Sequence, residues 1–220
     1  NEKNLLRFGA TNKNEKSFLA SIAKLFFRHE KDKSQKKSEF EMIMDSELSL
    51  EEAMVERIIE KLNIDNILQF HNGNIPSIFY NETELNDVIL SDFSETKIYK
   101  KLYDKTKNNI HLKIIINGFE NFKNYLKDKK ETVDYFYLWD IVCSGILDTK
   151  DNGISRNLII LKEENNDITN NVSIICPTSS NYLYNNEKPS LLIYQRDSFF
   201  EPIVLAENKR DKIFPIAMLQ

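Results

Sequence analysis

The sequence predicts an α+β domain in which amino-terminal helices pack on a carboxy-terminal antiparallel sheet. Apolar residues recur at helical spacing through residues 1–150, whereas residues 151–220 hold short β-rich runs separated by polar turns. No helical pattern separates these runs, which favours antiparallel pairing. We expect all 220 residues to form a single domain, a length that buries roughly 70% of the surface of the unfolded chain.

The first helix is predicted from Asn14 onward, because one face is apolar. A Lys-rich stretch at residues 31–38 then breaks the pattern and is expected to be an exposed loop. Ser49 and Glu52 form a capping-box pattern, which predicts the start of a second helix. A shorter helical piece through Ile64–Leu68 is expected to end near Gly73 and Pro76. The apolar residues of the first helix are Phe18, Leu19, Ile22, Leu25 and Phe26.

Three further helical regions are predicted. The first spans Ser94–Tyr103 and the second spans Leu112–Leu126, where an i, i+3/i+4 rhythm continues in spite of Gly118. The third, Val133–Ile146, is aromatic on all sides, which predicts a helix buried in the middle of the fold.

Four strands are predicted in the carboxy-terminal part, and polar turns such as residues 181–188 separate them. Proline lacks the N–H that a sheet ladder needs, so Pro202 is expected at a strand edge. The four runs are Leu158–Leu161, Val172–Cys176, Leu191–Tyr194 and Phe199–Leu205.

Composition narrows the function classes. The net charge is −4 and both signs are interspersed, so a nucleic-acid partner is not favoured. One feature alone suggests a nucleic-acid or transcription-associated module, the basic cluster of Lys31, Lys33, Lys36 and Lys37. Because Asp32 interrupts this cluster, a solvated loop explains it better than a nucleic-acid site does.

The presence of only two cysteines favours a reduced compartment, and no apolar stretch is as long as a membrane span. The chain begins at Asn1 without a signal peptide, so we expect a domain excised from a longer, non-secreted polypeptide.

No complete catalytic or metal site is evident. His29, His71 and His111 are far apart, and the five glycines do not cluster into a phosphate-binding loop, so no metal and no cofactor are predicted. Cys143 lies within the aromatic helix and Cys176 precedes Pro177. For both cysteines, a packing role is favoured over a role as a catalytic nucleophile.

A nucleophile that opens an amino-terminal helix, followed by helices and then a sheet that delivers a histidine, is the layout of papain-like cysteine proteases. Here the stretch Asn14-Glu15-Lys16-Ser17-Phe18-Leu19 and the later Phe199-Phe200-Glu201 resemble the two catalytic segments of the ovarian-tumour (OTU) deubiquitinase group. The resemblance implies an OTU-like architecture with a degenerate site, because Asn14, Ser17 and Phe199 stand where the family has aspartate, cysteine and histidine.

A second resemblance covers most of the chain. Phe18–Ala23, Tyr137–Ile141, Asn157–Leu161 and Phe200–Ile203, with residues 167–177, resemble segments of large uncharacterised proteins of nucleocytoplasmic large DNA viruses, the mimivirus-like giant viruses. Abundant Asn, Lys and Ile fit that origin, which implies a location in the host cytoplasm or the virion.

The leading hypothesis is therefore a non-catalytic OTU-like binding or assembly module of a large viral protein. Its expected partner is a protein: ubiquitin, or other domains of the same polypeptide. The alternative is an active cysteine protease with a rearranged site that uses Cys143 or Cys176 with one of the three histidines. A thiol within hydrogen-bond reach of an imidazole would favour this alternative.

Overall fold

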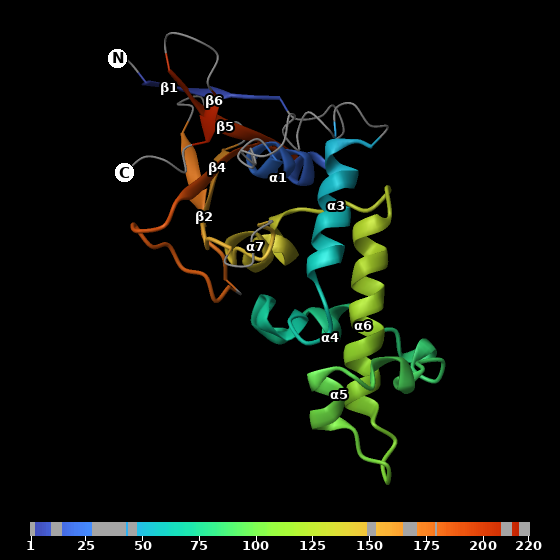
Figure 1. Cartoon of the computed structure of the whole chain (residues 1–220). Helices are drawn as coiled ribbons and strands as arrows, with labels where there is room; N and C mark the ends of the chain where they lie inside the picture. The colour runs from blue at the N-terminus through green and yellow to red at the C-terminus, as the bar shows by residue number, and fades with distance from the viewer. Residues whose placement is uncertain are drawn as a thin grey trace.

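A mixed helix-and-strand fold is seen in the computed structural model of the chain (Figure 1). The structure describes residues 3–9, 15–27, 43, 48–148, 153–164, 171–178, 180–207 and 213–215. The Lys31–Lys37 cluster and Asn14 lie outside these residues.

Helices are present in the main predicted regions, but their bounds differ. They begin and end inside Ser94–Tyr103 and Val133–Ile146 and extend beyond Leu112–Leu126 at both ends. The piece Ile64–Leu68 forms only a 3₁₀ turn, and a helix that was not predicted covers Ile75–Phe79. The Ser49–Glu52 capping box forms: the Glu52 N–H donates to Ser49 Oγ at 3.3 Å and the Ser49 N–H donates to Glu52 Oε2 at 3.0 Å. Short 3₁₀ turns at Ile67–Gln69, His71–Gly73, Glu82–Glu84 and Leu90–Phe93 fill the region after it. The helices are α1 (Ser17–Phe27), α3 (Leu50–Lys61), α4 (Ile75–Phe79), α5 (Lys97–Leu102), α6 (Ile110–Lys127) and α7 (Tyr135–Cys143).

The sheet has the strand order β1-β5-β4-β2-β3, and β6 also pairs with β5. Two hairpin pairs, β2–β3 and β4–β5, are antiparallel as predicted, but β2 and β4 run parallel, so the expected antiparallel sheet is wrong at this pair. Parallel neighbours need a connection of a dozen or more residues. The connection from β2 to β4, residues 164–189, contains β3 and, in the part that the structure describes, no helix. The strands are β1 (Lys3–Arg7), β2 (Asn157–Glu163), β3 (Val172–Ile175), β4 (Ser190–Arg196), β5 (Phe199–Glu207) and β6 (Ile213–Pro215).

Strand β1 lies in the part of the chain that was expected to be helical. It pairs antiparallel with the second half of β5, with Leu5 opposite Leu205 and Arg7 opposite Ile203. Its sequence, Lys-Asn-Leu-Leu-Arg, has neither β-branched residues nor alternation, so no local pattern marks it as a strand. β5 therefore has neighbours on both sides, and Pro202 lies just beyond the last residue that pairs with β1 rather than on an edge strand.

One face of the sheet is buried under helices. Alternate residues of neighbouring strands, such as Ile160, Ile193 and Phe200, are almost completely buried and belong to the same hydrophobic core as α1, α3, α6 and α7. Helix α7 lies between the sheet and the long helices α3 and α6 in Figure 1. Its Leu138, Ile141 and Val142 are fully buried, as predicted, but Phe136 is 50% exposed, so the helix is not buried on all sides.

Candidate functional site

The two positions of the degenerate site that the structure describes, Ser17 and Phe199, hold no nucleophile–base pair. Ser17 is completely buried, and its Oγ accepts the Phe200 N–H at 3.1 Å and donates to the Ser198 carbonyl at 3.5 Å. Phe199 is partly exposed, whereas the neighbouring Phe200 is buried with its ring 5.3 Å from that of Phe18. The Ser17 hydroxyl therefore joins a helix to a strand.

A second serine completes this contact. Ser21, one turn further along α1, donates from Oγ to the Phe200 carbonyl at 3.0 Å. The N–H and the carbonyl of Phe200 are thus both hydrogen-bonded to serines of α1. Phe200 lies in the part of β5 that does not pair with β1. Because buried backbone groups must find partners, these serines are explained by the architecture alone.

The two cysteines have opposite environments. Cys143, at the end of α7, is almost fully buried; burial, together with the negative charge of Asp140, raises the pKa of its thiol to about 12. Such a thiol is a poor nucleophile at neutral pH. Cys176 is exposed and directly follows β3.

Cys176 shares a cavity with His71. The cavity, which we call the α7 cavity, has a volume of about 230 Å³. His29 lies outside the described residues, and His111 is exposed at the start of α6, so His71 is the histidine that the structure places near a thiol. The remaining lining residues are Tyr135, Phe136, Tyr137, Trp139, Asp140, Ile175, Pro177, Thr178 and Ser180.

A buried carboxylate supports this cavity. Asp140, only 2% exposed, accepts the His71 backbone N–H at 2.8 Å and a hydrogen bond from Ser180 Oγ. This contact holds an unusual backbone, because His71, Asn72 and Gly73 have φ angles of 50°, 53° and 76°. Left-handed conformations cost free energy in residues other than glycine and persist where surrounding contacts enforce them.

The cavity offers a thiol and an imidazole without the contacts of an assembled catalytic triad. The His71 ring packs against Phe136 and Tyr137, with centroids 5.2 Å and 5.6 Å apart. Asp140 binds the backbone of His71 and not its ring. Among the hydrogen bonds of the described residues, none joins Cys176 to His71. The two side chains therefore line the same pocket without forming a thiol–imidazole pair.

A larger apolar pocket adjoins the α7 cavity at Trp139, Ile175, Cys176 and Pro177. This β3 pocket has a volume of about 580 Å³ and also includes residues of β2 and the segment Tyr182–Tyr184. Three of its large lining side chains are unusually exposed: Ile174 64%, Leu183 74% and Tyr184 69%. Val172, two residues before Ile174 on β3, is 49% exposed but does not line the pocket. Exposed apolar patches of this kind mark interaction sites.

Sequence reasoning missed most of this surface. Leu183 and Tyr184 lie in a segment interpreted as a polar turn, and Asp140 was read only as part of an aromatic helix. The sequence signal for this surface is three consecutive large side chains, Tyr182–Tyr184, flanked by Asn181 and Asn185. The connection that crosses from β3 to β4 carries them beside β3, and no local pattern predicts such a crossing.

Comparison of the chain with family models, with curated proteins and with solved structures gave no match. The resemblances to the OTU group and to proteins of giant viruses therefore stay predictions. Within the described ranges, no group of three or more His, Cys, Asp or Glu side chains is placed to hold a metal ion. Nor do those ranges contain a helix long and apolar enough to span a bilayer.

Proposed function

We propose that this chain is a non-catalytic protein-binding module whose partner docks on β3 and the segment Tyr182–Tyr184. The observation that carries the proposal is the group of three large side chains, Ile174, Leu183 and Tyr184, that line the β3 pocket and are each more than 60% exposed. Exposed apolar surface is unfavourable in water, and its burial by a partner contributes roughly 25 cal/mol of binding free energy per Å².

The position of β3 favours an extended peptide segment as the occupant. β3 is the last strand in the sheet order and, within the described residues, pairs only with β2. Its outer edge can add a further strand, whose side chains would alternate between solvent and the surface next to Ile174. A pocket of about 580 Å³ is large enough for an apolar side chain from such a segment.

The likeness to the OTU group points to ubiquitin, with its extended tail, as the first partner to test, and the viral resemblance points to other domains of the same polypeptide as the second. A non-catalytic role is supported by Ser17, whose hydroxyl is occupied by backbone groups, and by Phe199, which has no basic group to offer.

A titration of the protein with ubiquitin, measured by isothermal calorimetry, tests whether ubiquitin is the partner. We expect Ile174→Arg and Leu183→Arg to abolish binding, because each places a charge in the centre of the docking surface. Ile89→Arg is the matched control: Ile89 is 62% exposed between two 3₁₀ turns, away from β3, and its replacement should leave binding unchanged.

The docking surface itself can be tested without a known partner. A displayed library of random peptides is selected on the wild-type protein, and the selected peptides are then tested on Ile174→Arg. Loss of binding is expected. If ubiquitin does not bind, ubiquitin is the wrong partner; if selected peptides bind Ile174→Arg as well as wild type, the surface is wrong.

The shared α7 cavity favours one competing function, a thiol hydrolase. In that case His71 would accept the proton of the Cys176 thiol as the sulfur attacks a carbonyl carbon. A ubiquitin-based suicide probe separates the two proposals. Labelling that disappears in Cys176→Ser and in His71→Gln, and persists in Cys143→Ser, would establish the enzyme; we expect no labelling.

A further inference from the structure

A basic surface lies at the end of the molecule farthest from the sheet, at the bottom of Figure 1, where α5 leads into α6. We call residues 97–111 the basic tip. They include five exposed lysines and one aspartate, so their net charge is +4 with His111 neutral, whereas the whole chain carries −4. The lysines are Lys97, Lys100, Lys101, Lys105 and Lys107.

Most of this charge is available to a ligand. Lys100 pairs with Glu95 at 2.9 Å and Lys107 with Asp104 at 3.2 Å, but both lysines are largely exposed, and such pairs are weak in water. Lys97, Lys101 and Lys105 form no ion pair with any residue that the structure describes. A cleft of about 540 Å³ is lined by Lys101, Lys105, Lys107 and His111 together with Tyr103.

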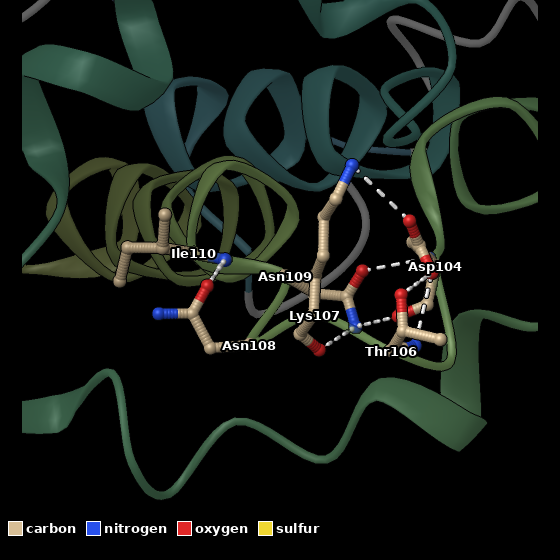
Figure 2. Close-up of polar contacts among 6 residues, drawn as sticks. All are labelled: Asp104, Thr106, Lys107, Asn108, Asn109 and Ile110. Atoms are coloured by element: carbon tan, nitrogen blue, oxygen red, sulfur yellow. Dashed lines mark hydrogen bonds and ion pairs between the residues drawn. The ribbon is translucent and has the colours of Figure 1, made fainter.

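The loop after α5, which carries Lys105 and Lys107, is held by its own polar groups, as Figure 2 shows. The Asp104 carboxylate accepts the Thr106 N–H at 2.9 Å and the Thr106 hydroxyl at 2.7 Å. Asn109 accepts the Asp104 N–H at 2.8 Å and donates to the carbonyls of Asp104 and Lys107 at 3.0 Å and 2.9 Å. These bonds define the loop conformation before any ligand arrives, which reduces the entropy lost on binding.

An aromatic platform lies between the lysines. Tyr99 and Tyr103, one turn apart on and after α5, stack with centroids 4.5 Å apart and an interplanar angle of 13°. Tyr103 is 37% exposed and also lines the basic cleft. Exposed aromatic faces beside lysines are the elements with which proteins bind bases and phosphates of single strands.

We propose that the basic tip binds single-stranded nucleic acid, with phosphates at Lys101 and Lys105 and a base stacked on Tyr103. A duplex is disfavoured because α5 has only six residues, too short to fill a major groove. The sequence analysis did not favour a nucleic-acid partner, since its evidence was confined to Lys31–Lys37. Residues 97–111 are contiguous, but their cleft and their stacked tyrosines are seen only in the fold.

Fluorescence anisotropy with labelled oligo-dT and oligo-U of about 12 nucleotides tests this inference. Binding should weaken between about 50 mM and about 200 mM salt, and each phosphate contact contributes about −0.7 to the log–log slope. The double variant Lys101→Glu, Lys105→Glu should flatten the slope by about 1.4. Lys127→Glu with Lys130→Glu changes the net charge equally at the other end of α6 and should leave the slope unchanged.

Variants of Tyr103 distinguish the contribution of base stacking to binding from that of the lysine charges. Tyr103→Ala should weaken single-strand binding roughly tenfold, while Tyr103→Phe keeps the ring and should bind like wild type. No binding at about 50 mM salt, or wild-type binding by the double lysine variant, would overturn the proposal. So would equal or tighter binding of duplex DNA, polyglutamate or phosphatidylserine vesicles, because the tip would then be an unspecific cationic surface.

Discussion

At the scale of single residues, Lys16 is one of the buried charged residues of the described fold. The residue is only 6% exposed, and its Nζ has no hydrogen-bond partner among the residues that the structure describes. Burial lowers the pKa of this amine below 10.5, although the charges of Asp128, Glu131 and Glu51 act in the opposite direction. A buried, unpaired ammonium group costs free energy.

We therefore predict that Lys16→Met stabilises the protein by about 1–3 kcal/mol at neutral pH, measured by urea unfolding. Because the pKa is lower in the folded than in the unfolded state, the penalty is fully present at lower pH and disappears as pH rises through 10.5. The gain should shrink accordingly in alkaline buffer. Lys130→Met, at an exposed lysine, is the control; an equal gain there would contradict the explanation.

Single residues also show why the candidate site was only partly predictable. The sequence analysis allowed either cysteine to act with any of the three histidines, and nothing in the sequence favours Cys176 with His71, since 104 residues lie between them. Their shared cavity depends on Asp140, which holds the strained backbone at His71, and on Ser180. Each of these contacts links segments that are distant in the sequence.

At the scale of secondary-structure elements, the crossing of α4 and α6 depends on one glycine. A Cβ added to Gly118 would lie 2.0 Å from the Pro76 carbonyl oxygen and 2.6 Å from its carbonyl carbon. Because both atoms belong to the backbone, α4 would have to move. In the sequence this glycine only weakened the helical pattern, whereas in the fold it permits close packing.

Gly118→Ala should therefore destabilise the protein by about 1–3 kcal/mol in thermal or urea unfolding, in spite of the better helix propensity of alanine. Asn124→Ala, at an exposed position of the same helix, is the matched control and should be neutral or stabilising. A stabilising effect of Gly118→Ala would show that α4 does not pack as closely as described.

At the scale of the whole molecule, a polar ladder crosses the exposed face of the sheet. Arg7 of β1 pairs with Glu201 of β5, and its guanidinium lies 4.1 Å above the Tyr194 ring of β4. The Tyr194 hydroxyl donates in turn to Glu163 of β2, a hydrogen bond that raises the pKa of the tyrosine. The ladder links an amino-terminal strand to three strands from the carboxy-terminal part.

Removal of residues 1–9 should lower the thermal midpoint and cause concentration-dependent association, because β5 would expose an unpaired edge along residues 203–207. Light scattering and thermal unfolding measure both effects. Arg7→Ala is the control: it breaks the ladder but keeps the strand, so the protein should remain monomeric and lose about 0–1 kcal/mol. A truncated protein that stays monomeric with an unchanged midpoint would contradict the role of β1.

The sequence by itself determined the elements whose signals are local. Apolar periodicity located α1, α3, α6 and α7, the Ser49–Glu52 pair marked where α3 begins, and β-rich runs located β2 to β5. These features depend on neighbours within a few residues, so their free energies can be read from short windows.

Only the tertiary structure decided the parallel β2–β4 pair, the place of β1, the α7 cavity and the β3 pocket. Each depends on which distant segments become neighbours, and that choice follows from the burial of the whole core instead of any local preference. The basic tip differs from these features, because residues 97–111 are contiguous and their charge is visible in the sequence; the structure adds the cleft and the stacked tyrosines.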